Sequence, residues 1–270
     1  MNRSELMNSK KIVIKIGSSS LMHESTGKLN LGKIEKLVRI LVDIKNSGKE
    51  CVLVSSGAIA VGRNTIGLKK RPEHLPLKQA CAAIGQAKLM SVYQRLFAEY
   101  STSAAQVLLT KANLSNPETR KNAENTLNEL LWLDTVPIIN ENDSVSTDEI
   151  AFVQTFGDND RLSALVAELI GADLLILLSD IDGMYTDDPK SHPDAKLIAE
   201  VTSIEKVTDM AKGTSAAGVG TGGMEAKVAA AQIATMAGAN MVITNGNDVE
   251  NITRVLNGEE VGTLFTRGAQ

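Results

Sequence analysis

Cysteine is scarce in this sequence of 270 residues and occurs only at Cys51 and Cys81. No CxxC pair is present, and the spacing matches no metal-binding motif. A disulfide-rich scaffold needs more cysteines in a shorter chain, so this fold class is excluded. Two cysteines in a chain of this length suit a reducing compartment, which makes the cytoplasm the expected location.

Long apolar runs and an excess of basic residues are also missing. The longest strongly apolar run lies at 174–178, far too short to span a bilayer, and the N-terminus has no apolar segment typical of a signal peptide. The formal net charge of −4 argues against nucleic acid as the main partner. Aromatic residues make up only 3% of a chain that is 43% hydrophobic, so we expect a globular protein with an aliphatic, alanine-rich core, no membrane span and no nucleic acid partner.

Short apolar runs, rich in β-branched residues and followed by small or polar ones, predict the strands. They begin at Lys11, Glu50, Thr135, Asp173 and Asn240, with a weaker candidate at Ala104. Because the runs are continuous rather than alternating, they favour strands buried on both faces. Helical periodicity separates them at 33–48, 75–98, 118–132, 160–170 and 224–238. The alternation predicts an α/β fold, a three-layer sandwich with a mainly parallel central sheet, in one domain with two lobes.

Unusual residues gather at the ends of the predicted strands, where ligands bind in open α/β sheets. Lys15 interrupts an apolar strand close to Gly17. It either faces water from an edge strand or projects toward an anion, with Gly17 letting that ligand approach the backbone. Ser55, Ser56 and Gly57 follow the next strand, and serine here either caps a helix or adjoins N–H groups that receive a carboxylate or phosphate. The sequence leaves both pairs of alternatives open.

The most polar part of the sequence contains two clusters, at 140–143 and 158–160. Acids and amides that follow a buried strand suit an ammonium group, because it requires hydrogen-bond acceptors. One alternative is that Asp158 or Asn159 caps the following helix and that the first cluster is a solvated loop. A magnesium site is a further alternative, although the spacing matches no metal motif.

The glycine-rich stretch GTGGMEAK precedes an alanine-rich helix and ends at Lys227. Gly218, Gly220 and Gly223 satisfy the dinucleotide pattern G-x-G-x-x-G, but no strand precedes them, which argues against a Rossmann NAD site. The Walker and protein-kinase motifs are absent. A flexible surface loop is one interpretation. The other is a phosphate site, because Lys227 in the first turn opposes the helix dipole and a bound phosphate would reverse that penalty.

Two lysines beside glycine-rich loops, with a carboxylate cluster between them in the sequence, favour phosphoryl transfer. That reaction needs alignment and positive charge more than covalent help from the protein. If the acceptor is a carboxylate, it needs no general base, which fits a chain whose histidines are only His23, His74 and His192. The residues by themselves predict a phosphate-handling α/β enzyme.

Taken in order along the chain, these motifs resemble the amino-acid kinase family, and within it the branch that phosphorylates glutamate. The similar stretches cover nearly the whole chain and include VIKIGSSSL, VLVSSGAIAVG, KQACAAIGQAKLM, VPIINENDSV, GDNDRLSALVA, LLLSDIDGMYTDDP and GTGGMEAK. NEND, GDND and GTGGM together point to this branch rather than to aspartate, carbamate or UMP kinases. The resemblance implies the amino-acid kinase fold over 1–270, with a glutamate-binding lobe near 1–170 and an ATP-binding lobe near 171–270. It also implies a form without the C-terminal PUA-type domain of many relatives.

The resemblance assigns roles to individual residues. Lys15 and Lys227 would neutralise the charge of the transferring phosphoryl group, and Asp160 would orient both lysines. The residues implied in glutamate binding are Ser56, Gly57, Asn140, Asp143, Asp158 and Asn159. The residues implied in ATP binding are Lys15, Gly17, Ser179, Asp180, Thr221, Gly222, Gly223, Met224, Glu225, Ala226 and Lys227.

Cofactors and partners also follow from the resemblance. It implies ATP with Mg²⁺, the metal being held largely by phosphates and water, and it implies the conversion of L-glutamate to L-glutamyl 5-phosphate in proline biosynthesis. Proline as a feedback inhibitor, a homo-oligomer and a glutamyl phosphate reductase are further expectations. The alternatives are a kinase of the same family acting on acetylglutamate or aspartate, and a non-catalytic nucleotide-binding protein on the same fold. A free α-amino group on the substrate distinguishes the glutamate reaction from that of an acetylglutamate kinase, because Asp143 and Asp158 suit a cation and an acylated amine carries no charge.

Overall fold

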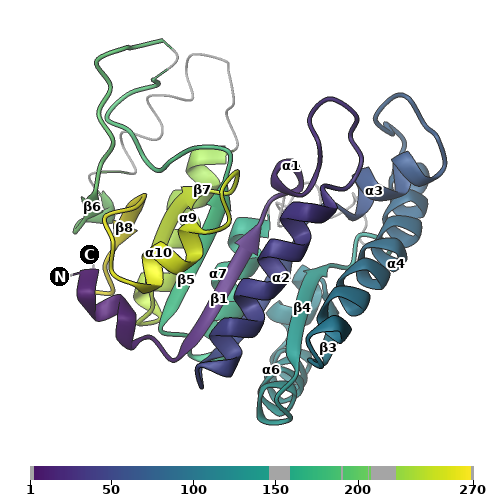
Figure 1. Ribbon diagram of the computed structural model, residues 1–270, viewed down its shortest axis with the longest axis horizontal. Coiled ribbons are helices and arrows are strands. Elements are labelled where there is room, and N and C mark those ends of the chain that lie inside the picture. The colour runs from purple at the N-terminus through teal and green to yellow at the C-terminus, as the bar shows by residue number, and fades with distance from the viewer. Residues whose placement is uncertain (1–2, 146–158, 190, 206, 208–222, 269–270) are drawn as a thin grey trace. The chain divides into compact units, whose positions relative to one another are not determined.

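The computed structural model describes residues 3–145, 159–189, 191–205, 207 and 223–268 (Figure 1). Its strands are β1 (Lys11–Ile16), β2 (Glu50–Ser55), β3 (Ala104–Leu109), β4 (Val136–Glu141), β5 (Leu174–Ser179), β6 (Glu200–Val201), β7 (Asn240–Asn245) and β8 (Thr263–Phe265). Every strand expected from the sequence is present, including the weaker candidate at Ala104. The short strands β6 and β8 were not predicted, because two or three residues carry no measurable period.

The strands of the described residues form one eight-stranded sheet in the order β3-β4-β2-β1-β5-β7-β8-β6. Strand β4 pairs in parallel with both β2 and β3, β5 pairs in parallel with β7, and β6 pairs in parallel with β8. Strands β7 and β8 are antiparallel. The predicted α/β class with a mainly parallel central sheet is confirmed.

Helices pack around this sheet. They are the 3₁₀ helix η1 (Arg3–Asn8) and the α-helices α1 (Ser18–Leu21), α2 (Leu31–Asn46), α3 (Ala58–Thr65), α4 (Leu75–Glu99), α5 (Lys111–Ser115), α6 (Pro117–Trp132), α7 (Asn159–Ile170), α9 (Gly223–Met236) and α10 (Asn251–Leu256). The five helices expected from periodicity correspond to α2, α4, α6, α7 and α9, with bounds that differ by at most two residues.

Local sequence explains where the helices α2 and α6 begin. The side chain of Asn30 accepts a hydrogen bond from the Lys33 N–H at 3.1 Å, which caps α2. Asn116 caps α6 in the same way, and Pro117 then occupies the first helical position, where its missing N–H has no cost. Both starts follow the asparagine-cap rule, although the hydrophobic period alone had placed the start of α2 slightly later.

The chain divides into two compact units. The middle unit is Ile16–Asn159, and the terminal unit combines Met1–Lys15 with Asp160–Gln270. One boundary therefore falls inside β1, and the other falls after the first residue of α7.

In the middle unit, helices α3 and α4 pack with their backbones in direct contact. A Cβ atom at Gly62 would lie 1.8 Å from the carbonyl oxygen of Cys81, and one at Gly85 would lie 1.8 Å from that of Ala58. No side chain larger than hydrogen fits at either crossing, so the two glycines fix the position of one helix on the other.

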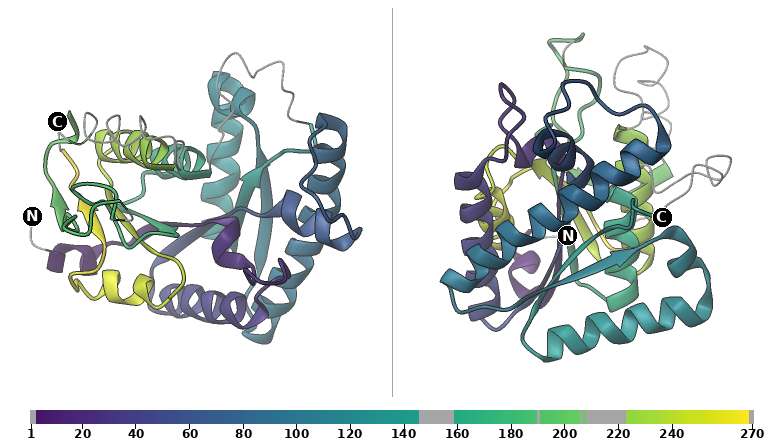
Figure 2. Two further views of the ribbon diagram at one scale, coloured as in Figure 1. Left: turned by 90° about the horizontal axis from the view of Figure 1, so that it is seen from above. Right: turned by 90° about the vertical axis from the view of Figure 1, so that its right-hand side faces the viewer.

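In the terminal unit, β5 is buried along its whole length, as its continuous apolar run predicts. Helices α9 and α10 both contact β7 and lie on opposite faces of this part of the sheet (Figure 2). Within this unit the layers are therefore helix, sheet and helix. Among the described residues, no helix is long and apolar enough to cross a membrane.

Candidate active site

Three charged side chains form a buried cluster in the terminal unit. Lys15 lies near the end of β1, Asp160 in the first turn of α7 and Lys227 near the start of α9. The Nζ of Lys15 lies 2.5 Å from Asp160 Oδ1, and the Nζ of Lys227 lies 3.0 Å from Asp160 Oδ2. The three residues are only 5%, 1% and 7% exposed in that order. We call them the lysine cluster. The alternative in which Lys15 faces water is wrong, because its side chain is buried against Asp160.

The electrostatics of the lysine cluster favour an anionic ligand. Burial would raise the pKa of Asp160, but the charges of Lys15 and Lys227 outweigh burial and hold that pKa below its ordinary value. Asp160 is therefore ionised at neutral pH, and each of its oxygens orients one ammonium group. The three side chains together carry two positive charges and one negative charge, which suits a phosphoryl group.

The start of α9 places Gly223, the last glycine of the glycine-rich stretch, beside Lys227. Besides Asp160, the Nζ of Lys227 donates to the carbonyl oxygen of Gly223 at 3.2 Å. Met224, Glu225 and Ala226 form the rest of this first turn. Thr221 and Gly222, which the sequence also assigned to ATP, lie outside the described residues.

The remaining residues predicted to bind the nucleotide lie at or directly after the ends of strands. Ser179 ends β5, where its hydroxyl donates to Asp180 Oδ1 at 3.0 Å and its carbonyl accepts from the Gly246 N–H at 2.6 Å. Asn245, at the end of β7, donates to Asp182 Oδ1 at 2.7 Å, an ordered polar contact that the sequence had not predicted. Gly17 follows β1 in the middle unit. Its φ of −78° is open to any residue, so the backbone there does not require glycine.

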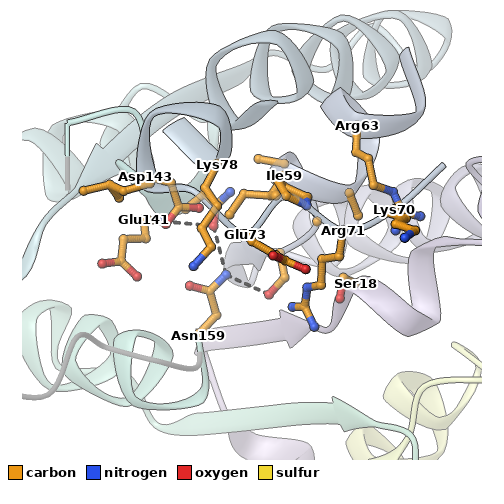
Figure 3. Close-up of a pocket in the computed structure, with 17 residues that line it drawn as sticks. Ser18, Ile59, Arg63, Lys70, Arg71, Glu73, Lys78, Glu141, Asp143 and Asn159 are labelled. Atoms are coloured by element: carbon orange, nitrogen blue, oxygen red, sulfur yellow. Dashed lines mark hydrogen bonds between the residues drawn. The ribbon is translucent and has the colours of Figure 1, made fainter. Parts of the chain in front are cut away.

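The middle unit contains a pocket of about 1120 Å³ (Figure 3). It is lined by five of the six residues that the sequence assigned to glutamate, namely Ser56, Gly57, Asn140, Asp143 and Asn159. The sixth, Asp158, lies outside the described residues. Residues that directly follow β2, residues at and after the end of β4 and the first residue of α7 thus line one pocket, as the placement of ligands at strand ends leads us to expect.

A chain of hydrogen bonds orders the polar wall of this pocket. The Nδ2 of Asn159 donates to Ser56 Oγ at 2.7 Å and to Asn140 Oδ1 at 2.9 Å, and Asn140 Nδ2 donates in turn to Gln86 Oε1 at 2.9 Å. Because Ser56 Oγ accepts from Asn159, its own O–H is directed elsewhere and is a donor for a ligand. Both amide hydrogens of Asn159 are donated to protein atoms, so its Oδ1 is the atom that can accept a hydrogen bond from a ligand.

The start of α3 forms a second wall of the pocket. Gly57 has a φ of +106°, a conformation that favours glycine, and no side chain caps the helix. The interpretation of the serines as caps of α3 is therefore wrong. Ala58 and Ile59 line the pocket at this uncapped turn, whose N–H groups have no intrahelical acceptor.

The pocket is rich in charge. Its cations are Arg63, Lys70, Arg71 and Lys78, and its carboxylates are Glu73, Glu141 and Asp143. Burial raises the pKa of Asp143 above its ordinary value. In the described part of the chain no salt bridge joins Asp143 to a cation. A cationic group on a ligand would form an ion pair with Asp143.

The sequence analysis did not assign Gln86 or Lys78 to the site. Both lie in the stretch KQACAAIGQAKLM, which was used only to support the family resemblance. A signal was present, because Gln86 is a polar residue on the buried side of α4 and Lys78 is a lysine in that helix's first turn. The sequence does not show which pocket either residue faces, because that depends on how α4 packs on α3.

Comparisons with known proteins show the family to which the chain belongs. The family model described as "Amino acid kinase family" matches residues 10–245. The chain belongs to the amino acid kinase family. Among curated relatives, the glutamate 5-kinase of Carboxydothermus hydrogenoformans is 51% identical over 97% of this chain and 69% of the relative. That of Clostridium perfringens is 48% identical over 97% of both chains.

Solved structures of the amino acid kinase fold are more distant in sequence. UMP kinase from Bacillus anthracis has a TM-score of 0.63 at 18% identity and covers 97% of both chains. UMP kinase from Ureaplasma parvum has a TM-score of 0.66 at 16% identity and covers 95% of this chain and 98% of its own. At such identities the likeness concerns the fold alone.

Proposed function

We propose that this protein transfers the γ-phosphoryl group of ATP to the γ-carboxylate of L-glutamate, giving L-glutamyl 5-phosphate and ADP, the first step of proline biosynthesis. The observation that carries the proposal is the sequence identity of 48–51%, over 97% of this chain, with the two glutamate 5-kinases described above. The lysine cluster and the pocket supply chemistry that fits this reaction. Acetylglutamate and aspartate as acceptors, and a non-catalytic nucleotide-binding role, are not favoured.

The lysine cluster would stabilise the transferring phosphoryl group. An oxygen of the γ-carboxylate forms a bond to the γ-phosphorus while the bond from that phosphorus to the bridging oxygen of ADP breaks. The nucleophile is already ionised, so no proton has to move. Lys15 and Lys227 would neutralise charge on the phosphoryl and leaving oxygens, and Asp160, fixed by its two ion pairs, keeps both ammonium groups in position before the substrate arrives.

The pocket of the middle unit would bind glutamate. Ser56 has an O–H available to donate to a carboxylate, and Asn159 has an oxygen available to accept from the α-ammonium group. Asp143 would supply the negative charge for that ammonium group, with Asp158 as a second carboxylate. Gly57 and Asn140 shape the wall. An acetylated amine carries no positive charge and would leave Asp143 without a partner.

The terminal unit would bind ATP. We assign this role to Ser179, Asp180, Lys15 and the stretch from Thr221 to Lys227, whose glycines let N–H groups approach phosphate. Gly17, which the resemblance also assigns to ATP, belongs to the middle unit. Among the described residues, no group of three or more histidine, cysteine, aspartate or glutamate side chains could hold a metal ion. We therefore propose that Mg²⁺ arrives with ATP, bound by phosphate oxygens and water.

Regulation and partners belong to the same proposal. The product is a reactive acyl phosphate, so a glutamyl phosphate reductase is the expected acceptor of the product. We further propose a cytoplasmic homo-oligomer that proline inhibits.

The test is Mg²⁺-dependent release of ADP from ATP with L-glutamate, L-aspartate, N-acetyl-L-glutamate and UMP offered separately. Hydroxylamine is included, because it converts an acyl phosphate to a hydroxamate. Turnover with glutamate and a hydroxamate product are expected. Turnover with another acceptor and none with glutamate would overturn the substrate, and ATP binding without any turnover would favour a non-catalytic protein.

A further inference from the structure

The charges of the pocket outnumber the roles given to them so far. Glutamate brings an α-ammonium group and two carboxylates, of which only the γ-carboxylate reacts. Asp143 and Asn159 suit the ammonium group. A buried α-carboxylate also needs a partner, and a cation that contacts it would discriminate between glutamate and uncharged analogues.

Four cations line the pocket, and they differ in exposure and in partners. Lys70 and Arg71 are exposed and lie between α3 and α4, where solvent screens them. Arg63 is engaged through its Nη2, which donates to Asn64 Oδ1 at 3.3 Å, while its Nε is buried and has no hydrogen-bond partner among the described residues. Lys78 is half-buried and, among the described residues, forms no hydrogen bond or salt bridge through its side chain.

Lys78 also stands on a rigid support. It lies in the first turn of α4, where its N–H donates to the carbonyl oxygen of His74 at 3.0 Å, and its side chain extends into the pocket toward Asn159 (Figure 3). The helix itself is fixed on α3 by the crossings at Gly62 and Gly85. A lysine in a first turn opposes the helix dipole, so this position is unfavourable for Lys78 until an anion lies beside it.

We propose that Lys78 binds the α-carboxylate of glutamate while Asp143 binds its α-ammonium group. The inference rests on the proposed function and adds a residue that determines specificity. A cation on the reacting carboxylate would stabilise that nucleophile more before attack than during it, because its charge disperses as the new bond forms. A cation on the non-reacting carboxylate binds ground state and transition state alike. Lys78 therefore acts on KM rather than on kcat.

The experiment compares L-glutamate with its α-amide, L-isoglutamine, which keeps the γ-carboxylate and the ammonium group. Hydroxamate formation gives kcat and KM for each acceptor. In the wild-type protein the α-amide should have a kcat/KM about 10- to 100-fold lower than glutamate. In Lys78→Met the KM for glutamate should rise about 10- to 100-fold with kcat unchanged, and the preference for glutamate over the α-amide should vanish.

Two further variants separate this role from a structural one. Lys88→Met removes an exposed lysine from the same helix and should change neither KM nor the preference. Lys78→Arg keeps the charge and should retain the preference for glutamate, which also guards against a Met variant that folds poorly. The KM for ATP should stay constant in all of them.

The outcomes are distinct. Wild-type protein that yields no hydroxamate from glutamate would overturn the proposed function itself. With an active wild type, Lys78→Met that keeps its KM for glutamate would overturn the inference. The same holds if its KM rises equally for glutamate and the α-amide, because that result reports a distorted pocket.

Discussion

The charges of the lysine cluster in the terminal unit are paired with one another, whereas Asp143 and Lys78 of the pocket in the middle unit face space for a ligand. Asp160 sits between two lysines within 3.0 Å, and all three side chains are buried. Asp143 and Lys78 each lack a salt-bridge partner among the described residues. Asn159 of the pocket and Asp160 of the lysine cluster are nevertheless consecutive in the chain.

This contrast matches two different tasks. Groups that stabilise a transition state must stand in place before the reaction begins, and mutual ion pairs achieve this. Groups that recognise a substrate gain most when the substrate itself supplies the missing partner, because a wrong ligand then leaves a charge uncompensated. Changes to the lysine cluster should therefore affect kcat, and changes to the pocket should affect the KM for glutamate.

Replacing Asp160 should have the largest effect. Asp160→Asn leaves two buried lysines without their shared carboxylate, which should lower the stability of the protein by about 3–5 kcal/mol and kcat by at least about 100-fold. Urea unfolding and the hydroxamate assay measure the two effects. Asp194→Asn, at an exposed carboxylate of the same unit, should change neither.

The pH dependence checks the cause. The folded-state pKa of Asp160 is lowered, so its stabilisation is complete above the ordinary value of 3.8 and is lost as the pH falls through the lowered pKa. The stability difference between wild type and Asp160→Asn should shrink over that acidic range. A difference that persists unchanged below it would contradict the ion-pair explanation.

Gly85→Ala should disturb the pocket through the backbone. Its Cβ would lie 1.8 Å from the carbonyl oxygen of Ala58, so α3 and α4 must separate, at a cost of about 3 kcal/mol in stability. The KM for glutamate should rise as Lys78 moves with α4. Gly32→Ala is the matched control, because nothing but Asn30 Oδ1 at 3.8 Å would approach its Cβ. Equal stabilities of the two variants would refute the close crossing.

Asp143→Asn should weaken glutamate binding without affecting chemistry. Loss of a charge-assisted hydrogen bond of about 2 kcal/mol corresponds to a KM roughly 30-fold higher, with kcat retained. The folded-state pKa of Asp143 is raised, so its ionised form costs stability above that pKa. The variant should therefore unfold at a higher temperature than wild type at pH 7, with an advantage that disappears as the pH falls toward 3.8. A variant with unchanged KM would remove Asp143 from the pocket.

Gln86→Leu should have the smallest effect. It leaves the buried Nδ2 of Asn140 without its acceptor at 2.9 Å, which loosens the wall that orients Asn159 and Ser56. We expect a cost of about 1 kcal/mol and a KM for glutamate raised about fivefold. Gln94→Leu, at an exposed position of the same helix, is the control. A KM equal to wild type would show that the hydrogen-bond chain does not depend on Gln86.

The sequence predicted the framework well because its signals are local. Continuous apolar runs marked the long strands, and helical periods marked α2, α4, α6, α7 and α9. Strands β6 and β8 were not predicted, because two or three residues show no pattern of their own and these strands depend on pairing with their neighbours in the sheet. Helix α2 begins at Leu31, earlier than predicted, because Asn30 caps it. A cap is a single polar residue, so an analysis of hydrophobic periodicity does not detect it.

The site was only partly predictable. Lys15 interrupts an apolar strand, Asp160 belongs to a polar cluster and Lys227 ends a glycine-rich stretch. The sequence therefore marks all three as candidates, but it does not give their mutual distances. Gln86 and Lys78 are ordinary residues of a long helix until Gly62 and Gly85 fix that helix against α3. The residues that the sequence missed are those whose role depends on how two helices cross.

The most direct test of the division between lysine cluster and pocket is one variant measured in two ways. Lys227→Met should lower kcat by at least about 100-fold, whereas calorimetry should show a Kd for glutamate equal to that of wild type. The account would be contradicted if Lys227→Met weakened glutamate binding while turnover at saturating glutamate continued at the wild-type rate.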